Sequence, residues 1–226
     1  MSLITSNKIY IFVVQIIIMI KVGISGNRYS GKSTICKMFK QISIPVFDAD
    51  TVLKFILSHE VSVMNEIKKS VGPQIFKSSD INPKLIKNKD TFDKIVNCAE
   101  YELMQAYEKF NSKNPNSIYT IFHSSILFER SWNEKMNYNI NVFCPKITRM
   151  ERCKEVTKTS TNPNGMKISD ISYLLRNEID DIDKNKMCNF VLHNYEAGDP
   201  LTQVNDIDQR IIDRFLKSES IVLKHY

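Results

Sequence analysis

Short apolar runs alternate along the chain with longer stretches in which apolar residues recur every three or four positions. Runs rich in β-branched and aromatic residues predict strands at 20–24, 45–47, 118–122, 140–143 and 190–192. Helical periodicity is clearest at 32–41, 91–110, 147–158, 168–181 and 204–217. Short apolar strands separated by helices are typical of a parallel sheet covered on both faces. The pattern therefore predicts an α/β fold.

Two segments depart from this alternation. Residues 54–116 form a long, mainly helical excursion between the second and third predicted strands, where an α/β enzyme would place a substrate-covering subdomain. Residues 9–20 are almost continuously apolar, but this run is shorter than the roughly 20 residues of a membrane-spanning helix. No small-residue cleavage site follows it. We therefore expect no membrane role, and we interpret residues 1–18 as an extension upstream of the true start, with the domain at 19–226.

The strongest motif is GNRYSGKS at residues 26–33, a full match to the phosphate-loop pattern G-x-x-x-x-G-K-[ST]. Glycine permits the dihedrals of a backbone that wraps phosphate, and the N-terminus of the following helix attracts anions. A glycine turn with a chance lysine is the alternative, but a predicted strand precedes this motif and a predicted helix follows it. The residues expected to bind nucleotide phosphates are Gly26, Asn27, Arg28, Tyr29, Ser30, Gly31, Lys32, Ser33 and Thr34.

Two members of this loop have expected roles of their own. Lys32 would neutralise charge on the β- and γ-phosphates, and the Ser33 hydroxyl would be a ligand of Mg²⁺.

The second predicted strand runs into two acidic residues, Asp48 and Asp50. Alternation at period 2 puts both carboxylates on one side if the strand continues that far. The carboxyl ends of parallel strands face the same crevice as the phosphate loop. One aspartate would then accept the proton of an attacking hydroxyl, and the other would hold metal-bound water. From spacing alone, a polar strand end with helix-capping aspartates is equally open.

Composition narrows the partners and the compartment. The formal net charge of +6 favours acidic partners, and without a long basic block a phosphorylated small molecule is expected rather than nucleic acid. The five cysteines are odd in number and include no C-x-x-C pair, which argues against a disulfide framework and a zinc site. A cytoplasmic location is the simplest expectation. The oligomeric state is left open by the sequence.

GISGNRYSGKST followed by IPVFDADTV resembles the opening of dephospho-coenzyme A kinases. The fragments VGPQIF, SSILFERSW, VFCP and NFVLHN follow in the family's order, so the resemblance runs from residue 19 to near residue 204. It implies a three-layer P-loop NTPase fold with a mostly parallel sheet, a helical substrate-covering subdomain at 54–116 and a lid at 146–165. It also implies Mg²⁺-dependent transfer of a phosphoryl group from ATP to the ribose 3′-hydroxyl of dephospho-coenzyme A.

The resemblance assigns roles by position. Asp50 matches the family's catalytic aspartate, and residues 29–34 match its ATP-phosphate segment. Arg152 matches a lid arginine that is placed to clamp the transferring phosphates. By analogy, Asp48 would support Mg²⁺ through water. Asn194 follows the last predicted strand, where related kinases shape the adenine pocket.

The chain also departs from the family's pattern. It has no His-Pro pair near 97–100, and in the altered I-P-L-L-F-E pattern Ser125 stands at the proline while His123 stands at a usually acidic position. The second lid arginine aligns with Val156, and a neighbouring lysine lacks arginine's planar fork. Two other functions therefore stay open: a nucleoside or nucleotide kinase with another acceptor, and a diverged regulatory protein that binds ATP without transferring phosphate.

Overall fold

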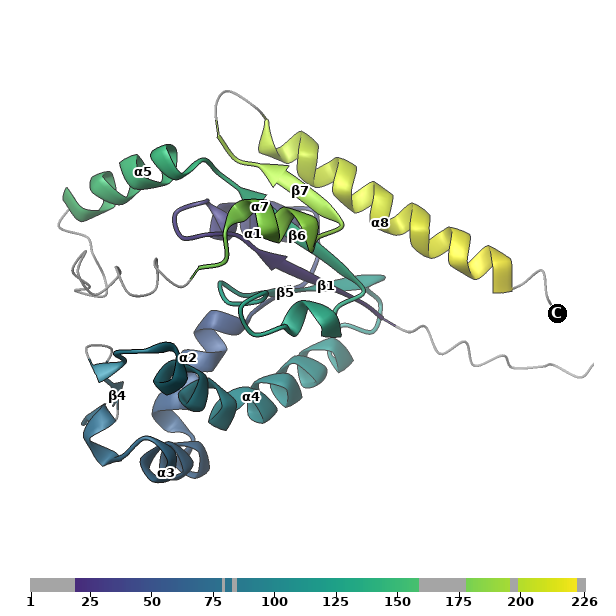
Figure 1. Ribbon diagram of the computed structural model, residues 1–226. Helices are drawn as coiled ribbons and strands as arrows, with labels where there is room; N and C mark the ends of the chain where they lie inside the picture. The colour runs from purple at the N-terminus through teal and green to yellow at the C-terminus, as the bar shows by residue number, and fades with distance from the viewer. Residues whose placement is uncertain (1–18, 79, 83–84, 159–177, 196–198, 223–226) are drawn as a thin grey trace, which may run out of the picture.

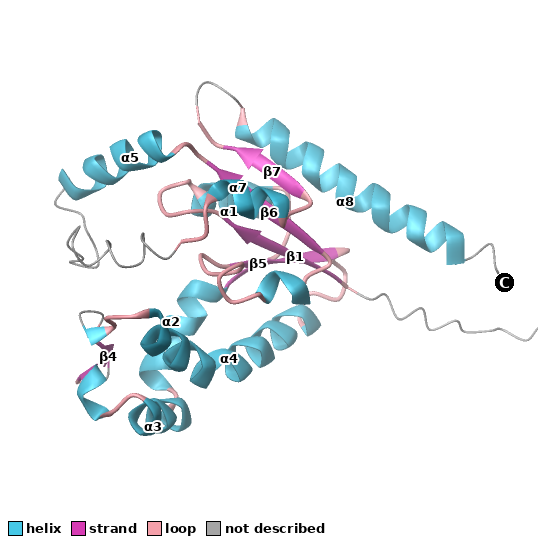
Figure 2. Ribbon diagram, viewed as in Figure 1, coloured by secondary structure: helices cyan, strands magenta, loops and turns pink. Residues whose placement is uncertain are grey.

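A five-stranded parallel sheet forms the centre of the molecule (Figure 2). The computed structural model describes residues 19–78, 80–82, 85–158, 178–195 and 199–222. The strand order is β2-β5-β1-β6-β7, so β1 is central. The strands are β1 (Ile20–Ser25), β2 (Val46–Asp48), β5 (Tyr119–His123), β6 (Tyr138–Phe143) and β7 (Phe190–His193). The α/β prediction and all five predicted strands are confirmed, each to within two residues at either end.

Helices cover both faces of this sheet and give three layers (Figure 1). One face carries α1 (Lys32–Gln41) and α8 (Pro200–Val222). The other carries α2 (Ala49–His59), α3 (Val61–Ser70) and α4 (Lys89–Ser112), which we call the α2–α4 lobe. The remaining described elements are η1 (Pro73–Ile75), β3 (Phe76–Lys77), β4 (Asp80–Ile81), η3 (Trp132–Lys135), α5 (Lys146–Lys158) and α7 (Asp181–Lys186).

Alternation along the buried strands divides the core into two apolar clusters. Val22 and Ile121 face the cluster beneath α1 and α8, where Phe39 is fully buried. Phe122 faces the α2–α4 lobe and packs against Phe47 and other aromatic rings. A sheet that is buried on both faces in this way fixes the positions of its strand ends, and these ends carry the loops discussed below.

Most predicted helices are confirmed, and one is corrected. The helix expected at 168–181 is wrong at its end, because residues 178–180 are not helical and α7 begins only at Asp181. The Asp180 side chain accepts a hydrogen bond from the Ile182 amide and so caps the start of α7. Residues 168–177 lie outside the described residues, as do residues 1–18 and the part of the expected lid at 159–165.

The expected helical excursion at 54–116 also contains strands. It includes all of α3 and α4, most of α2, and a two-stranded antiparallel pair formed by β3 and β4. Among the helices that the structure describes, none combines the length and the apolar character needed to cross a bilayer.

The junction between β2 and α2 corrects the expectation that Asp48 and Asp50 alternate along one strand. β2 ends at Asp48 and α2 begins at Ala49, so Asp50 lies in the first turn of a helix. The Asp48 carboxylate accepts a hydrogen bond from the Thr51 amide at 3.1 Å, which satisfies one of the unpaired N–H groups at the helix start. Asp48 is therefore a helix cap, as the alternative interpretation of the sequence allowed.

A second partner holds the Asp48 carboxylate in its charged form. His123 Nδ1 at the end of β5 lies 3.5 Å from Asp48 Oδ1. The hydrogen bond with His123, assisted by the Thr51 amide, lowers the pKa of Asp48 to about 2. Asp48 is therefore ionised throughout the neutral range, although its side chain is half exposed.

We predict that Asp48→Asn lowers the free energy of unfolding at pH 7 and that this deficit shrinks in acid. The Asp48 pKa is about 2 in the folded chain, against roughly 3.9 in an unfolded one. A carboxyl with a lowered pKa contributes stability above its unfolded pKa, and this contribution is lost as pH falls toward the folded value. Urea unfolding in metal-free buffer at several pH values between 7 and 3 measures the deficit. A deficit that stays constant over this range would contradict the prediction.

Candidate active site

The phosphate loop joins the central strand β1 to helix α1. Gly31 has φ of +90°, and a Cβ built there would lie 2.0 Å from the Asn194 side-chain nitrogen, so this position needs glycine. Lys32 Nζ donates a hydrogen bond to the Gly26 carbonyl at 2.6 Å and closes the loop on itself. The next residues, Ser33 and Thr34, are exposed in the first turn of α1. The loop thus presents a lysine and two hydroxyls at a helix N-terminus.

The electrostatic environment of Lys32 links the loop to Asp50. Burial lowers the pKa of Lys32, while the negative charge of Asp50 opposes this effect and the positive charge of Lys184 adds to it. Among the negatively charged groups near Lys32, Asp50 opposes the lowering most strongly. The structure therefore brings these two sequence-predicted residues into one site.

Backbone and side-chain donors fix the Asp50 carboxylate from the turn after β5. The Ser125 amide lies 3.0 Å from each carboxylate oxygen, and the Ser124 hydroxyl lies 3.2 Å from Oδ1. A proline at position 125 would have no N–H to donate. Ser125, which stands where the resemblance described above would place a proline, therefore supplies Asp50 with a hydrogen bond that proline cannot make.

Arg152 and Asn194 bind carbonyl oxygens of the phosphate loop. The Arg152 guanidinium donates to the carbonyls of Tyr29 at 3.2 Å and Ser30 at 3.3 Å, and also to the Asn194 carbonyl at 2.9 Å. The Asn194 side-chain amide donates to the Ser30 carbonyl at 2.7 Å. The first helix after β6 and the end of β7 therefore meet at the loop, and both predicted residues belong to the same site.

Arg149 connects the base of α5 with the loop and with the segment before α7. Its guanidinium donates to the Arg28 carbonyl at 3.2 Å and to the carboxylates of Glu178 at 3.4 Å and Asp181 at 3.5 Å. Glu178 also accepts a hydrogen bond from the Arg28 amide at 2.7 Å. Burial raises the pKa of Asp181, and the positive charge of Arg149 opposes that rise. Arg149 therefore supports the loop directly through the Arg28 carbonyl and indirectly through Glu178, which binds the Arg28 amide.

Some residues of the site were not found from the sequence. Glu178 and Lys184 belong to highly charged stretches that look like solvated surface. Glu129 belongs to the fragment SSILFERSW, but the sequence assigns it no role of its own. Each of them contacts the phosphate loop or its supports. The sequence shows only that these residues are charged, and their partners lie far away along the chain.

The oxygen donors at the site fit a hard divalent cation. The Ser33 hydroxyl is exposed at the start of α1, and the ionised Asp48 carboxylate is half exposed at the end of β2. Mg²⁺ is usually held by one or two such groups together with phosphate oxygens and waters. Within the described part of the chain, three or more His, Cys, Asp or Glu side chains do not cluster as a metal site.

Comparisons with known proteins place this chain in a family. The family model for dephospho-CoA kinase matches residues 20–199, a range that contains the phosphate loop and all five strands of the parallel sheet. A dephospho-CoA kinase from Fusobacterium nucleatum is 32% identical over 132 residues, which cover 56% of this chain and 63% of that protein. The match therefore spans less than two thirds of that relative.

Two further similarities agree with the family match. A dephospho-CoA kinase from Clostridium perfringens is 26% identical over 147 residues, covering 59% of this chain and 71% of that protein. A crystal structure from Thermus thermophilus aligns with a TM-score of 0.70 at 18% identity, over 85% of this chain and 97% of that one, and shows the shared fold. Because the family match includes the phosphate loop and the entire parallel sheet, the chain belongs to the dephospho-CoA kinase family.

Proposed function

We propose that this chain transfers the γ-phosphoryl group of ATP to the ribose 3′-hydroxyl of dephospho-coenzyme A, giving coenzyme A and ADP. The observation that carries the proposal is the Asp50 carboxylate, held by the Ser125 amide and electrostatically coupled to Lys32 of the phosphate loop. A proton acceptor beside a phosphate-binding lysine is what transfer to a hydroxyl requires. Membership of the dephospho-CoA kinase family supports this choice of acceptor.

Each residue has a role in the proposed transfer. The loop at 26–31 and the start of α1 bind the phosphates of ATP, and Lys32 leaves the Gly26 carbonyl to contact the transferring group. Asp50 orients the acceptor hydroxyl and takes its proton as the new oxygen–phosphorus bond forms and the bond to ADP breaks. Arg152 lies over the loop and neutralises developing charge. Asn194 borders the nucleotide.

The proposal includes Mg²⁺ as the divalent cation. Bound with ATP, it would supply charge neutralisation on the β- and γ-phosphates. Ser33 would hold it directly and Asp48 through water, which fits the hydroxyl and carboxylate oxygens described above.

The direct test supplies purified protein with ATP, Mg²⁺ and a panel of acceptors that includes dephospho-coenzyme A and several nucleosides, with products identified by mass. We expect coenzyme A and ADP in equal amounts. Phosphorylation of a nucleoside in preference to dephospho-coenzyme A would favour the other kinase function. ATP binding without transfer to any acceptor would favour the regulatory alternative.

We predict that Lys32→Ala lowers turnover at saturating ATP by roughly 10²-fold or more, because a cation that stabilises the transferring phosphate is lost. The matched control is Lys37→Ala, which removes an exposed lysine from the same helix α1. Circular dichroism tests that both variants are folded, and steady-state assays measure turnover. Wild-type turnover in folded Lys32→Ala would show that the lysine assignment is wrong.

We predict that Asp50→Asn lowers turnover by roughly 10²-fold or more while the Kd for ATP changes little. Asparagine keeps an oxygen that can accept from the Ser125 amide, but it cannot act as the proton acceptor. Isothermal titration measures ATP binding and a coupled assay measures turnover. Asp90→Asn is the control, because Asp90 also lies in a first helical turn, at the start of α4. If Asp50→Asn retained full turnover, Asp50 would not be the base.

A further inference from the structure

A fully buried lysine lies beneath the phosphate loop. The Lys184 side chain, in α7, is 0% exposed. Its Nζ lies 2.6 Å from Asn27 Oδ1 in the loop and 2.7 Å from Glu129 Oε1 in the turn after β5. An ammonium group is costly to bury unless a counter-charge and hydrogen-bond acceptors surround it. Lys184 has both, and they come from two different parts of the site.

Hydrogen bonds between side chains and backbone join the loop and the turn after β5 to the segment before α7. Glu129 Oε1 accepts a second hydrogen bond, from the Ile179 amide at 3.1 Å. The Asn27 side-chain amide donates to the Ile179 carbonyl at 3.3 Å. The loop, the turn after β5 and the segment before α7 therefore form a closed ring of contacts around the Lys184 ammonium.

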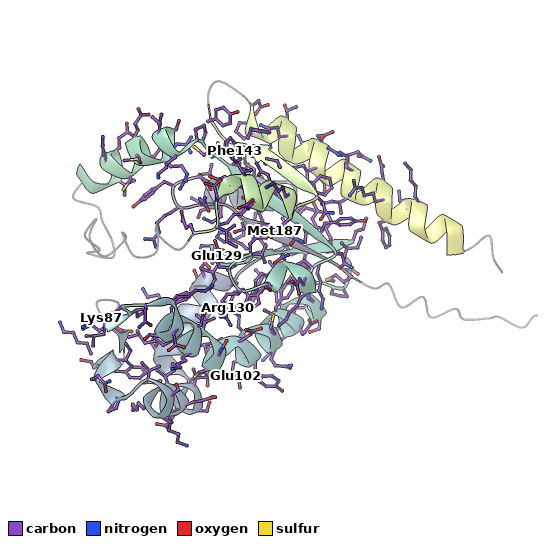
Figure 3. All side chains as sticks on the ribbon, in the orientation of Figure 1. Lys87, Glu102, Glu129, Arg130, Phe143 and Met187 are labelled. Atoms are coloured by element: carbon purple, nitrogen blue, oxygen red, sulfur yellow. The ribbon has the colours of Figure 1, made fainter. Side chains whose placement is uncertain are left out.

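Glu129 belongs to the turn that holds Asp50. Ser124 and Ser125 bind the Asp50 carboxylate, and Glu129 follows four residues after Ser125. Hydrogen bonds from the Ile126 amide to the Ser124 hydroxyl and from the Arg130 amide to the Ile126 carbonyl brace this turn. In Figure 3 the label of Glu129 lies between helix α7 and the α2–α4 lobe. Glu129 and the donors of Asp50 therefore belong to one hydrogen-bonded turn.

We propose that Lys184 is a positioning residue that fixes the distance and orientation between the phosphate loop and the Asp50 carboxylate. Its ammonium ties Asn27 to Glu129, and the braced turn carries this constraint to Asp50. A purely structural role would be served as well by a packed apolar pair, since a buried ion pair often adds no net stability. A misplacement of about 1 Å between reacting groups, by contrast, costs roughly 10²-fold in rate.

The test uses variants that separate an effect on the positions of the site residues from an effect on stability. Lys184→Met removes the ammonium and keeps the length of the side chain, but it leaves the Glu129 carboxylate buried without its counter-charge. The double variant Lys184→Met with Glu129→Gln removes both charges and keeps an oxygen that can accept from the Ile179 amide. Lys186→Met is the matched control, since Lys186 lies on the same helix and its side chain is 70% exposed.

Kinetics provide the first measurement, and this one rests on the proposed function. In the folded double variant we expect turnover to fall by about 10-fold or more, while the Kd for ATP stays within about 3-fold of the wild type. A structural role alone predicts that turnover recovers together with stability when both charges are removed. Wild-type turnover in the double variant would overturn the proposal. So would a loss of turnover matched by an equal loss of ATP affinity.

Amide hydrogen exchange provides a measurement that needs no acceptor. Binding of a non-hydrolysable ATP analogue to the wild type should slow exchange of the Ser125 amide, because the loop and the turn are tied through Lys184. In the double variant the analogue should bind without this effect. Equal slowing in both proteins, or none in the wild type, would overturn the proposal. If the wild type transferred phosphate to no acceptor, the proposed function would fail while this measurement still decided the role of Lys184.

Discussion

The phosphate loop has to leave backbone amides open to a ligand while the polar groups beneath it are removed from water. Asn27 is 3% exposed, and its side chain pairs with Lys184 and with the Ile179 carbonyl. Ser30 is 0% exposed, and its backbone carbonyl accepts hydrogen bonds from Arg152 and Asn194. Each buried polar group that lacks a partner costs about 1–3 kcal/mol. Since β1 is the central strand, the partners come from neighbouring strand ends and from α5 and α7. The rest of the site is arranged around this requirement.

The placement of Asp50 follows from the same arrangement. β5 lies between β1 and β2, so the turn after β5 is next to both the phosphate loop and the start of α2. Ser125 donates to Asp50 from this turn, and Glu129 contacts Lys184 from it. One short turn therefore connects the residue proposed as proton acceptor with the residues that support the loop. The Ser125 amide is a donor that a proline at this position would lack.

The local sequence patterns predicted the sheet, α1 and the phosphate loop, because each is set by nearby residues: apolar runs, a glycine motif and helical periodicity. Alternation failed at Asp48, where capping of α2 ended the strand. The ion pair between Glu129 and Lys184 could not be predicted, because its members are 55 positions apart in the sequence and each stands among other charges. Such pairs depend on how strands and helices are placed, which one sequence does not reveal.

The contacts of Arg152 and Asn194 with the loop also determine which way its peptide planes face. In a trans peptide the carbonyl and the following N–H point in opposite directions. Both side chains bind the Ser30 carbonyl, so they turn the Gly31 amide toward the opposite side of the loop. The dipole of that peptide is thereby oriented before any anion arrives. A phosphate that reaches this side would meet an amide that is already ordered. Its binding would therefore not be weakened by a further loss of conformational entropy at this peptide.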